Sequence, residues 1–189
     1  MASLNEMVGQ IGNYRCYYGD GNAFLGMVDI EFPELKNLES EISGAGISGK
    51  ISWSTVGHYD SLELNLNFRN ITDDVAILTE QHAMDLSFYG AQQVYNYRDA
   101  KTIQRRVKID VRGFVKNTPL GSFKISELTE TKVTLELIFI KVEIDNKEEF
   151  YIDKLNMIAR IHGVDYLSDT REAIGMDTTL GDVVRAVLT

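Results

Sequence analysis

The sequence is poor in cysteine and proline, with one cysteine and two prolines among 189 residues. A single cysteine, Cys16, excludes a disulfide within the chain and a cluster of thiolate metal ligands, and it fits a reducing compartment such as a bacterial cytoplasm. With prolines only at Pro33 and Pro119, a long proline-rich linker is excluded. Because 44% of the residues are hydrophobic, we expect one globular domain with an ordinary core.

Long apolar runs and an excess of basic residues are also missing. No run approaches the roughly 18 apolar residues of a membrane-spanning helix, and residues 1–10 lack the pattern of a signal peptide. The formal net charge is −9, so nucleic acid and anionic membranes would repel the protein as a whole. We therefore expect a soluble protein without membrane insertion.

Short runs of apolar and aromatic residues predict a mainly β chain. Residues 13–18 and 23–30 flank a cluster of Gly, Asp and Asn, which is typical of a β-hairpin. Residues 61–68 alternate strictly between apolar and polar side chains, which indicates one buried and one wet face. With short helices at about 73–84 and 168–174, the chain is a β-sandwich or barrel. Further strands are expected at 85–96, 103–115, 131–144, 148–152 and 155–161.

Residues 33–50 are rich in glycine and serine and show little apolar periodicity, which predicts a long irregular loop. A loop of this length inside a compact domain usually has a function. Gly44 to Gly49 has the G-x-G-x-x-G spacing of a dinucleotide site, but a polar segment precedes it and a predicted strand follows it. We therefore interpret the loop as an assembly element and expect no cofactor.

The histidines, the cysteine and the serines show no spacing that is typical of a catalytic or metal site. His58, His82 and His162 lie far apart, and none has ligand spacing with another or with Cys16. The serines lack the G-x-S-x-G pattern of a nucleophile elbow. We therefore expect neither an enzyme nor a metal site.

Charge is distributed unevenly along the chain. Residues 98–116 hold seven basic and two acidic residues, whereas residues 20–41 hold six acidic residues and one lysine. The basic segment has three open interpretations. It could bind nucleic acid, although few aromatic residues interleave with its charges. It could form solvated strand edges that resist aggregation. It could also complement the acidic segment of another copy and so set the register of an interface.

Several stretches, in order through residues 13–176, resemble the major tail tube proteins of contractile-tailed phages and R-type bacteriocins. The tail 177–189 extends past the usual end of that family. The stretches are Asn13-Tyr14 followed by 18–26 (YGDGNAFLG), 29–35 (DIEFPEL), 41–49 (EISGAGISG), 57–59 (GHY), 90–95 (GAQQVY), 111–113 (VRG), 161–167 (IHGVDYL) and 171–175 (REAIG).

The resemblance implies one tail tube domain over 1–189, built as a barrel-like β-sandwich. It has an N-terminal arm at 1–12, an assembly loop at 33–50 and a C-terminal extension at 177–189. The resemblance also implies hexameric rings that stack into the inner tube of a contractile tail, for DNA passage in a phage or membrane puncture in a bacteriocin. The implied partners are further copies of the chain, the tail sheath, the tail terminator, the baseplate and transient duplex DNA. The implied place is a virion tail or a secreted bacteriocin particle, assembled in the cytoplasm of the bacterial host.

The tube has a simple geometric expectation. If six subunits give about four strands each, normal strand spacing and tilt make a barrel roughly 50 Å across with a lumen of about 40 Å. An acidic lumen of that width would pass duplex DNA, roughly 20 Å across, and repel its phosphates. The lumen candidates are Glu63, Asn65 and Asn67.

The expected subunit contacts lie in the loop and in both charged segments. The expected contact residues are Glu31, Glu34, Glu39, Ile42, Ser43, Gly44, Gly46, Ile47, Gly49, Arg105 and Arg106.

The alternative function is a small-ligand or carbohydrate-binding β-sandwich module, which would be a monomer or small oligomer with an aromatic-lined face.

Overall fold

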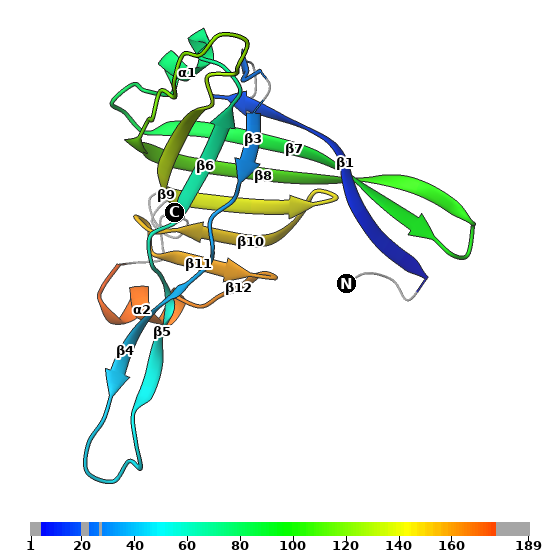
Figure 1. Ribbon diagram of the computed structural model, residues 1–189. Coiled ribbons are helices and arrows are strands. Elements are labelled where there is room, and N and C mark those ends of the chain that lie inside the picture. The colour runs from blue at the N-terminus through cyan, green and yellow to red at the C-terminus, as the bar shows by residue number, and fades with distance from the viewer. Residues whose placement is uncertain (1–4, 20–22, 27, 177–189) are drawn as a thin grey trace, which may run out of the picture.

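The computed structural model describes residues 5–19, 23–26 and 28–176. All its strands except β4 and β5 form one sheet that folds over on itself into two layers (Figure 1). The larger layer is antiparallel and runs in the order β12-β11-β10-β9-β8-β7-β1-β2. Its long central strands are β1 (Glu6–Tyr18), β7 (Met84–Asn96), β8 (Lys101–Asn117) and β9 (Thr131–Ile144). Its shorter strands are β2 (Ala23–Phe24), β10 (Lys147–Asp153), β11 (Ile158–Ile161) and β12 (Val164–Asp165).

The smaller layer consists of β3 (Val28–Glu31) and β6 (Glu63–Phe68), which cross over the long sheet in Figure 1. Strand β9 belongs to both layers, because its first half pairs with β6 and its second half with β10. The mainly β fold that the sequence predicts is confirmed, and the strands expected at 85–96, 103–115, 131–144 and 148–152 correspond to β7, β8, β9 and β10.

The hydrophobic core lies between the two layers. Leu62, Leu64, Leu66 and Phe68 are buried there, whereas Glu63 is exposed, as the alternation of residues 61–68 predicts. These side chains pack against buried residues of the long sheet, which are Leu86, Phe88, Val111, Val133, Leu135 and Leu137.

Cys16 is part of this core, and its burial raises the pKa of the thiol to about 12. Because only the thiolate is nucleophilic, we expect the native protein to react with Ellman's reagent at about pH 8 at least about 100-fold more slowly than the urea-unfolded chain. Stopped-flow absorbance measures both rates. A native rate within tenfold of the unfolded rate would contradict the burial of this thiol.

The irregular loop expected over residues 33–50 is corrected by the structure. Strand β4 (Asn37–Ile42) pairs with β5 (Ile51–Tyr59) in a separate two-stranded sheet, so strand structure is missing only from the link at 33–36 and the hairpin tip at 43–50. The apolar alternation of β4 is short, because Ser40 interrupts it between Leu38 and Ile42. Its pairing with a partner further along the chain makes it a strand, which a local pattern does not reveal.

The termini and helices also differ from the expectations. From Glu6 on, the expected N-terminal arm is part of β1 and pairs with β7. Helix α1 (Asp73–Ile77) ends well before residue 84, and turns and bends lead from it to Met84, which is buried as the first residue of β7. Helix α2 (Ser168–Ala173) lies where a helix was predicted, and the extension 177–189 lies outside the described residues. No helix in the described part of the chain is long and apolar enough to cross a membrane.

Candidate assembly surfaces

The β4–β5 hairpin projects from the body of the molecule at the bottom of Figure 1. The cross-strand pairs Ile42–Ile51 and Ser40–Trp53 place Leu38, Ile42, Ile51 and Trp53 on one face of the hairpin. All four are exposed, and Trp53 has 61% of its surface accessible. The hairpin therefore has an apolar face that nothing in its own chain covers, and such faces mark interaction sites.

The other face of the hairpin is polar. Glu39 accepts a hydrogen bond from the Ser52 hydroxyl at 2.6 Å, and Glu41 pairs with Lys50 at 2.8 Å. The structure thus brings together the contact residues predicted between positions 39 and 49, which are Glu39, Ile42, Ser43, Gly44, Gly46, Ile47 and Gly49. Glu31 and Glu34 lie outside the hairpin, at the end of β3 and in the link to β4.

The root of the hairpin is held by a glycine that the sequence did not single out for this role. Gly57 has a φ of 70°, in the left-handed region that disfavours other residues. A Cβ at this position would lie 2.6 Å from the buried side chain of Leu167. This close approach packs the base of β5 against the segment that leads into α2, and so fixes the direction of the hairpin.

A second surface is the far end of β1, β7 and β8, which run on past the core as a three-stranded ribbon, at the right of Figure 1. Within the described residues, Glu6–Asn13 of β1 and Lys101–Arg105 of β8 pair only with β7. Each outer strand of the ribbon therefore has a free edge, and a free edge is a template for pairing with another chain.

Arg105 and Arg106, predicted as subunit contacts, lie on this ribbon. The Arg105 guanidinium donates to the Gln92 side-chain oxygen at 2.6 and 3.2 Å. The Arg106 guanidinium lies over the Tyr89 ring at 5.0 Å and donates to the Asn146 side-chain oxygen at 3.3 Å. In the described part of the chain, neither guanidinium pairs with a carboxylate of its own copy, so both charges remain available to a neighbour.

A third surface is the face of the long sheet that points away from the core. Cross-strand neighbours on β7, β8, β9, β10 and β11 place acidic and basic side chains next to one another there. Its ion pairs are Arg112–Asp85 at 2.6 Å, Lys108–Asp110 at 2.6 Å, Lys141–Glu143 at 2.5 Å and Arg160–Glu148 at 2.8 Å. The face is therefore densely charged but internally paired.

The pair at Lys108 is half-buried, and burial alone would lower the pKa of its ammonium group. The hydrogen bond and the charge of Asp110 outweigh burial, so the pKa of Lys108 is raised above its ordinary value. This face was not predicted from the sequence. The signal was present in residues 106–112, where charged side chains alternate with Val107, Ile109 and Val111.

Glu63, Asn65 and Asn67 lie on a smaller polar face, on the outer side of β6. Glu63 pairs with Lys116, and the Asn65 side-chain oxygen accepts a hydrogen bond from the Thr134 hydroxyl at 2.8 Å. The Asn67 amide donates to Glu31 at 3.2 Å. The role of these three residues in a lumen stays a prediction, and the structure separates them from the larger face of the long sheet.

The histidines do not converge in space. His58 contacts the Val56 carbonyl, His82 contacts Tyr18 and Glu80, and His162 pairs with Glu149 at 2.7 Å. Among the residues that the structure describes, no group of three or more His, Cys, Asp or Glu side chains could hold a metal ion.

Comparison with known proteins adds an independent finding. Residues 10–175 match the family model of phage tail tube protein FII. The chain is 27% identical over 162 residues to the tail tube protein of Escherichia phage P2, covering 83% of this chain and 92% of that relative. Among solved structures, it is similar to a chain of the sheath–tube complex of PVC, an extracellular contractile injection system, in the extended state. The TM-score is 0.48 at 14% identity, and the match covers 71% of this chain and 90% of that chain. A chain of the PVC sheath/tube terminator structure gives a TM-score of 0.46, 13% identity and coverage of 71% and 95%.

Proposed function

Because the chain belongs to the phage tail tube protein FII family, we propose that its copies form hexameric rings that stack into the inner tube of a contractile phage tail or phage-tail-like bacteriocin. The match covers nearly the whole chain, from residue 10 to residue 175. As a tail tube protein, the chain is a structural component of a tail or a related particle, and we propose that it assembles in the cytoplasm of a bacterial host.

The main support for the proposed ring is the pair of free strand edges on the β1–β7–β8 ribbon. The two edges lie on opposite sides of the ribbon and belong to different strands, so they support a head-to-tail contact. A head-to-tail contact closes into a ring when the rotation between subunits permits it. Backbone pairing from copy to copy would then join the ribbons into a continuous barrel.

We propose the outer face of the long sheet as the main wall of the channel, with Glu63, Asn65 and Asn67 as the smaller candidate. The long sheet supports this role because it continues to both free edges of the ribbon. Within the described residues most of its charges form pairs, and Arg106, which has no carboxylate partner there, also lies on it, so the wall would not be acidic. Such a wall would bind a passing phosphate backbone only weakly, because a basic side chain that is paired with a carboxylate attracts phosphate less strongly.

The remaining partners follow from the tube. The sheath would surround it, and terminator and baseplate proteins would contact its two ends. In a phage the channel would hold duplex DNA transiently, whereas in a bacteriocin the tube would puncture a membrane. Capsid and terminase genes beside the gene for this chain would favour the phage.

Electron microscopy of the purified protein tests the proposal. We expect rings or stacked tubes with a central channel, formed by this chain alone or after seeding with baseplate. Isolated particles under every condition, together with binding to a small ligand or a glycan array, would favour the alternative of a ligand-binding β-sandwich module.

Reversing Arg105 and Arg106 to Glu together is expected to slow tube growth at least about tenfold at low salt, because complementary charges mainly set association rates and register. The difference should shrink near 1 M salt, where the Debye length is about 3 Å. Light scattering measures the rate, and circular dichroism should show an unchanged fold.

The matched control places the same charge change elsewhere, with Lys124→Glu and Lys116→Glu. Both lysines form exposed pairs with glutamates, away from the free strand edges. Growth of the arginine variant at the normal rate would contradict the contact role. Tight, salt-dependent binding of duplex DNA by the wild type but not by the variant would replace it with a nucleic-acid role.

A further inference from the structure

The core-facing side of the long sheet extends beyond the layer that covers it. Past the buried pair of Leu86 and Val111, the cross-strand pairs Phe88–Ile109 and Gly90–Val107 face the same way. Strand β3 and the segment after it cover only part of this area. The uncovered part forms an open groove of about 470 Å³, with Ile11, Ile30, Phe32, Phe88, Val107 and Ile109 among its lining residues.

The groove is apolar and only half closed by its own chain. Phe32 stands over it with its ring 5.3 Å from that of Phe88, yet 44% of the Phe32 surface remains accessible. Ile11 is also exposed at the opposite border. Gly90 leaves space on the floor of the groove, since a Cβ at this position would lie in contact with the Ile11 side chain, at 3.5 Å. The groove is thus a continuation of the core that lacks a cover.

We propose that this groove receives the apolar face of the β4–β5 hairpin of a second copy, with Trp53 seated between Phe32 and Val107. The proposal rests on the proposed tube and names the two surfaces that meet in it. Both surfaces are apolar, exposed and part of a folded element, so their burial against each other releases water from both.

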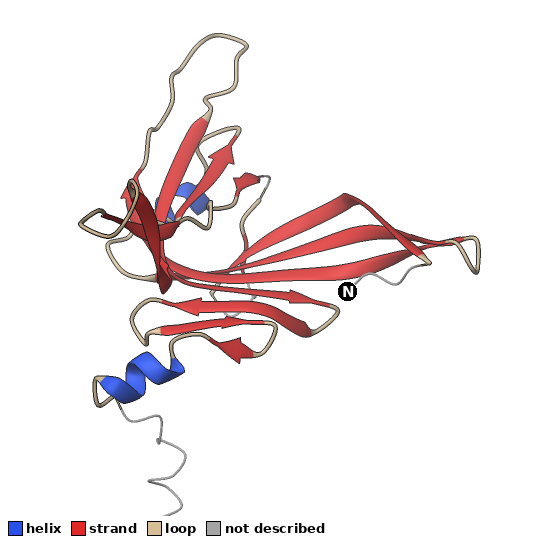
Figure 2. Ribbon diagram, turned by 90° about the horizontal axis from the view of Figure 1, so that it is seen from below, coloured by secondary structure: helices blue, strands red, loops and turns tan. Residues whose placement is uncertain are grey.

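The hairpin cannot fill the groove of its own copy. In Figure 1 the hairpin runs down and away from the point where β1 crosses β7 and β8, and the root contact of Gly57 with Leu167 fixes that direction. Figure 2, seen from below, also shows the body of the long sheet and the ribbon extending away from the hairpin side. The occupant therefore comes from another copy.

Charged side chains stay largely outside the proposed contact. Arg15 and Arg106 lie on the opposite face of the sheet from Phe88 and Val107. Glu39 and Glu41 lie on the polar face of the hairpin, opposite Trp53. The one acidic side chain that lines the groove, Asp29, is within hydrogen-bonding distance of the Tyr14 hydroxyl, at 3.2 Å.

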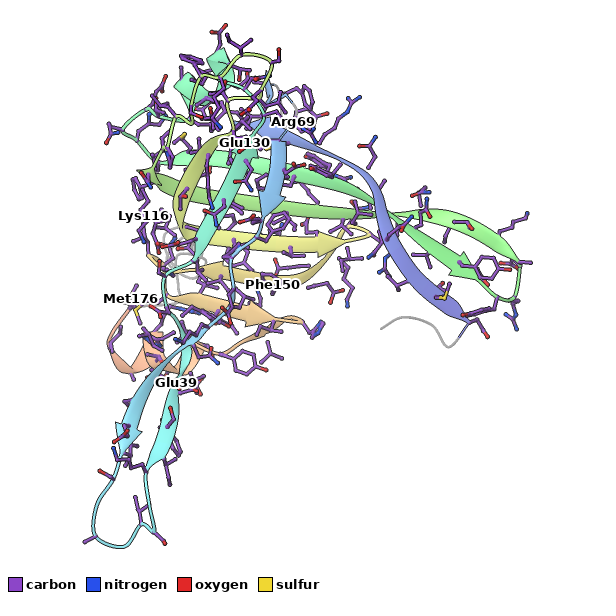
Figure 3. The ribbon with its side chains drawn as sticks, in the orientation of Figure 1. Glu39, Arg69, Lys116, Glu130, Phe150 and Met176 are labelled. Atoms are coloured by element: carbon purple, nitrogen blue, oxygen red, sulfur yellow. The ribbon has the colours of Figure 1, made fainter. Side chains whose placement is uncertain are left out.

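A competing receptor is the loop 118–130 between β8 and β9, where 87% of Phe123 and 97% of Ile125 is accessible. Figure 3 shows Arg69 and Glu130, which mark this end of the molecule, opposite Glu39 on the hairpin. The loop presents isolated side chains, whereas the groove is a preformed concave apolar surface of the kind that binds tightly. The groove is therefore the better receptor.

Cross-linking between differently labelled copies tests the contact. One preparation carries Trp53→Cys and a second carries Phe32→Cys, and the two are mixed, polymerised and treated with a short bis-maleimide. Cys16 stays in place, because it is buried. We expect covalent dimers in tubes and none in unassembled protein. The matched control mixes Trp53→Cys with Ile125→Cys.

Fluorescence gives a second measure, because Trp53 is the single tryptophan. Its emission should shift to shorter wavelength on assembly. The double variant Ile11→Ser, Phe32→Ser should lose this shift and grow tubes at least about tenfold more slowly, whereas Phe123→Ser with Ile125→Ser should behave as wild type.

Each other outcome overturns the contact. Dimers only with Ile125→Cys would move the receptor to the loop, and a shift that disappears on removal of residues 177–189 would mean that this segment, and not the groove, covers Trp53. Tubes that form with neither dimers nor a shift would refute the contact while leaving the proposed tube intact. Absence of tubes from the wild type under all conditions would refute the proposed function itself.

Discussion

Replacing Leu64 with alanine is expected to lower the free energy of unfolding by about 2–5 kcal/mol. Leu64 lies on β6 between the two layers, with none of its surface accessible, and it pairs across the strands with Leu135 of β9. Strands β3 and β9 flank β6, so the backbone cannot easily collapse into the space left by the lost side chain. The cost therefore includes a cavity as well as the lost burial.

Urea denaturation of the unassembled subunit, followed by far-ultraviolet circular dichroism, measures this loss. Trp53 is a poor probe here because it is exposed on the hairpin. The neighbouring change Glu63→Ala is the control and should stay within about 0.5 kcal/mol of wild type. Its partner Lys116 is half exposed, and exposed pairs contribute little. Reversed magnitudes would mean that β6 turns its other face to the core.

Deleting Ser43 to Gly49 is expected to abolish tube formation at concentrations at which the wild type polymerises, while the subunit stays folded. Outside the strand ladder and among the described residues, the backbone hydrogen bonds of the tip run from the Ile47 N–H to the Gly44 carbonyl and from the Gly49 N–H to the Ile47 carbonyl. No residue of the tip is part of the core. The deletion shortens the hairpin, disturbs the Ile42–Ile51 register and removes Ile47.

Electron microscopy and thermal unfolding separate the two effects of this deletion. The matched control replaces residues 43–49 with glycine and serine at unchanged length, which preserves the closure of the hairpin but removes Ile47. Tubes from this control but not from the deletion would assign the contact to the paired strands rather than to the tip. Normal polymerisation of the deletion variant would refute an assembly role for the segment.

The sequence by itself determined the features that depend on neighbouring residues. Strict alternation in residues 61–68 correctly placed Leu62, Leu64 and Leu66 in the core, because side chains of a strand point to opposite faces in turn. The short runs of apolar and aromatic residues correctly placed β7, β8 and β9. The ordered motifs along residues 13–176 correctly indicated the family, whose model spans residues 10–175.

Only the tertiary structure decided which distant segments meet. It made a strand of residues 37–42 by pairing them with β5, and it ended α1 at Ile77. The groove joins Ile11, Phe32 and Val107, which lie in three separate parts of the chain. The paired charges of the long sheet likewise come from different strands, as in Arg112 with Asp85. Strand register and cross-strand contacts depend on non-local pairing, and a local pattern contains no information about the partner that a strand will find.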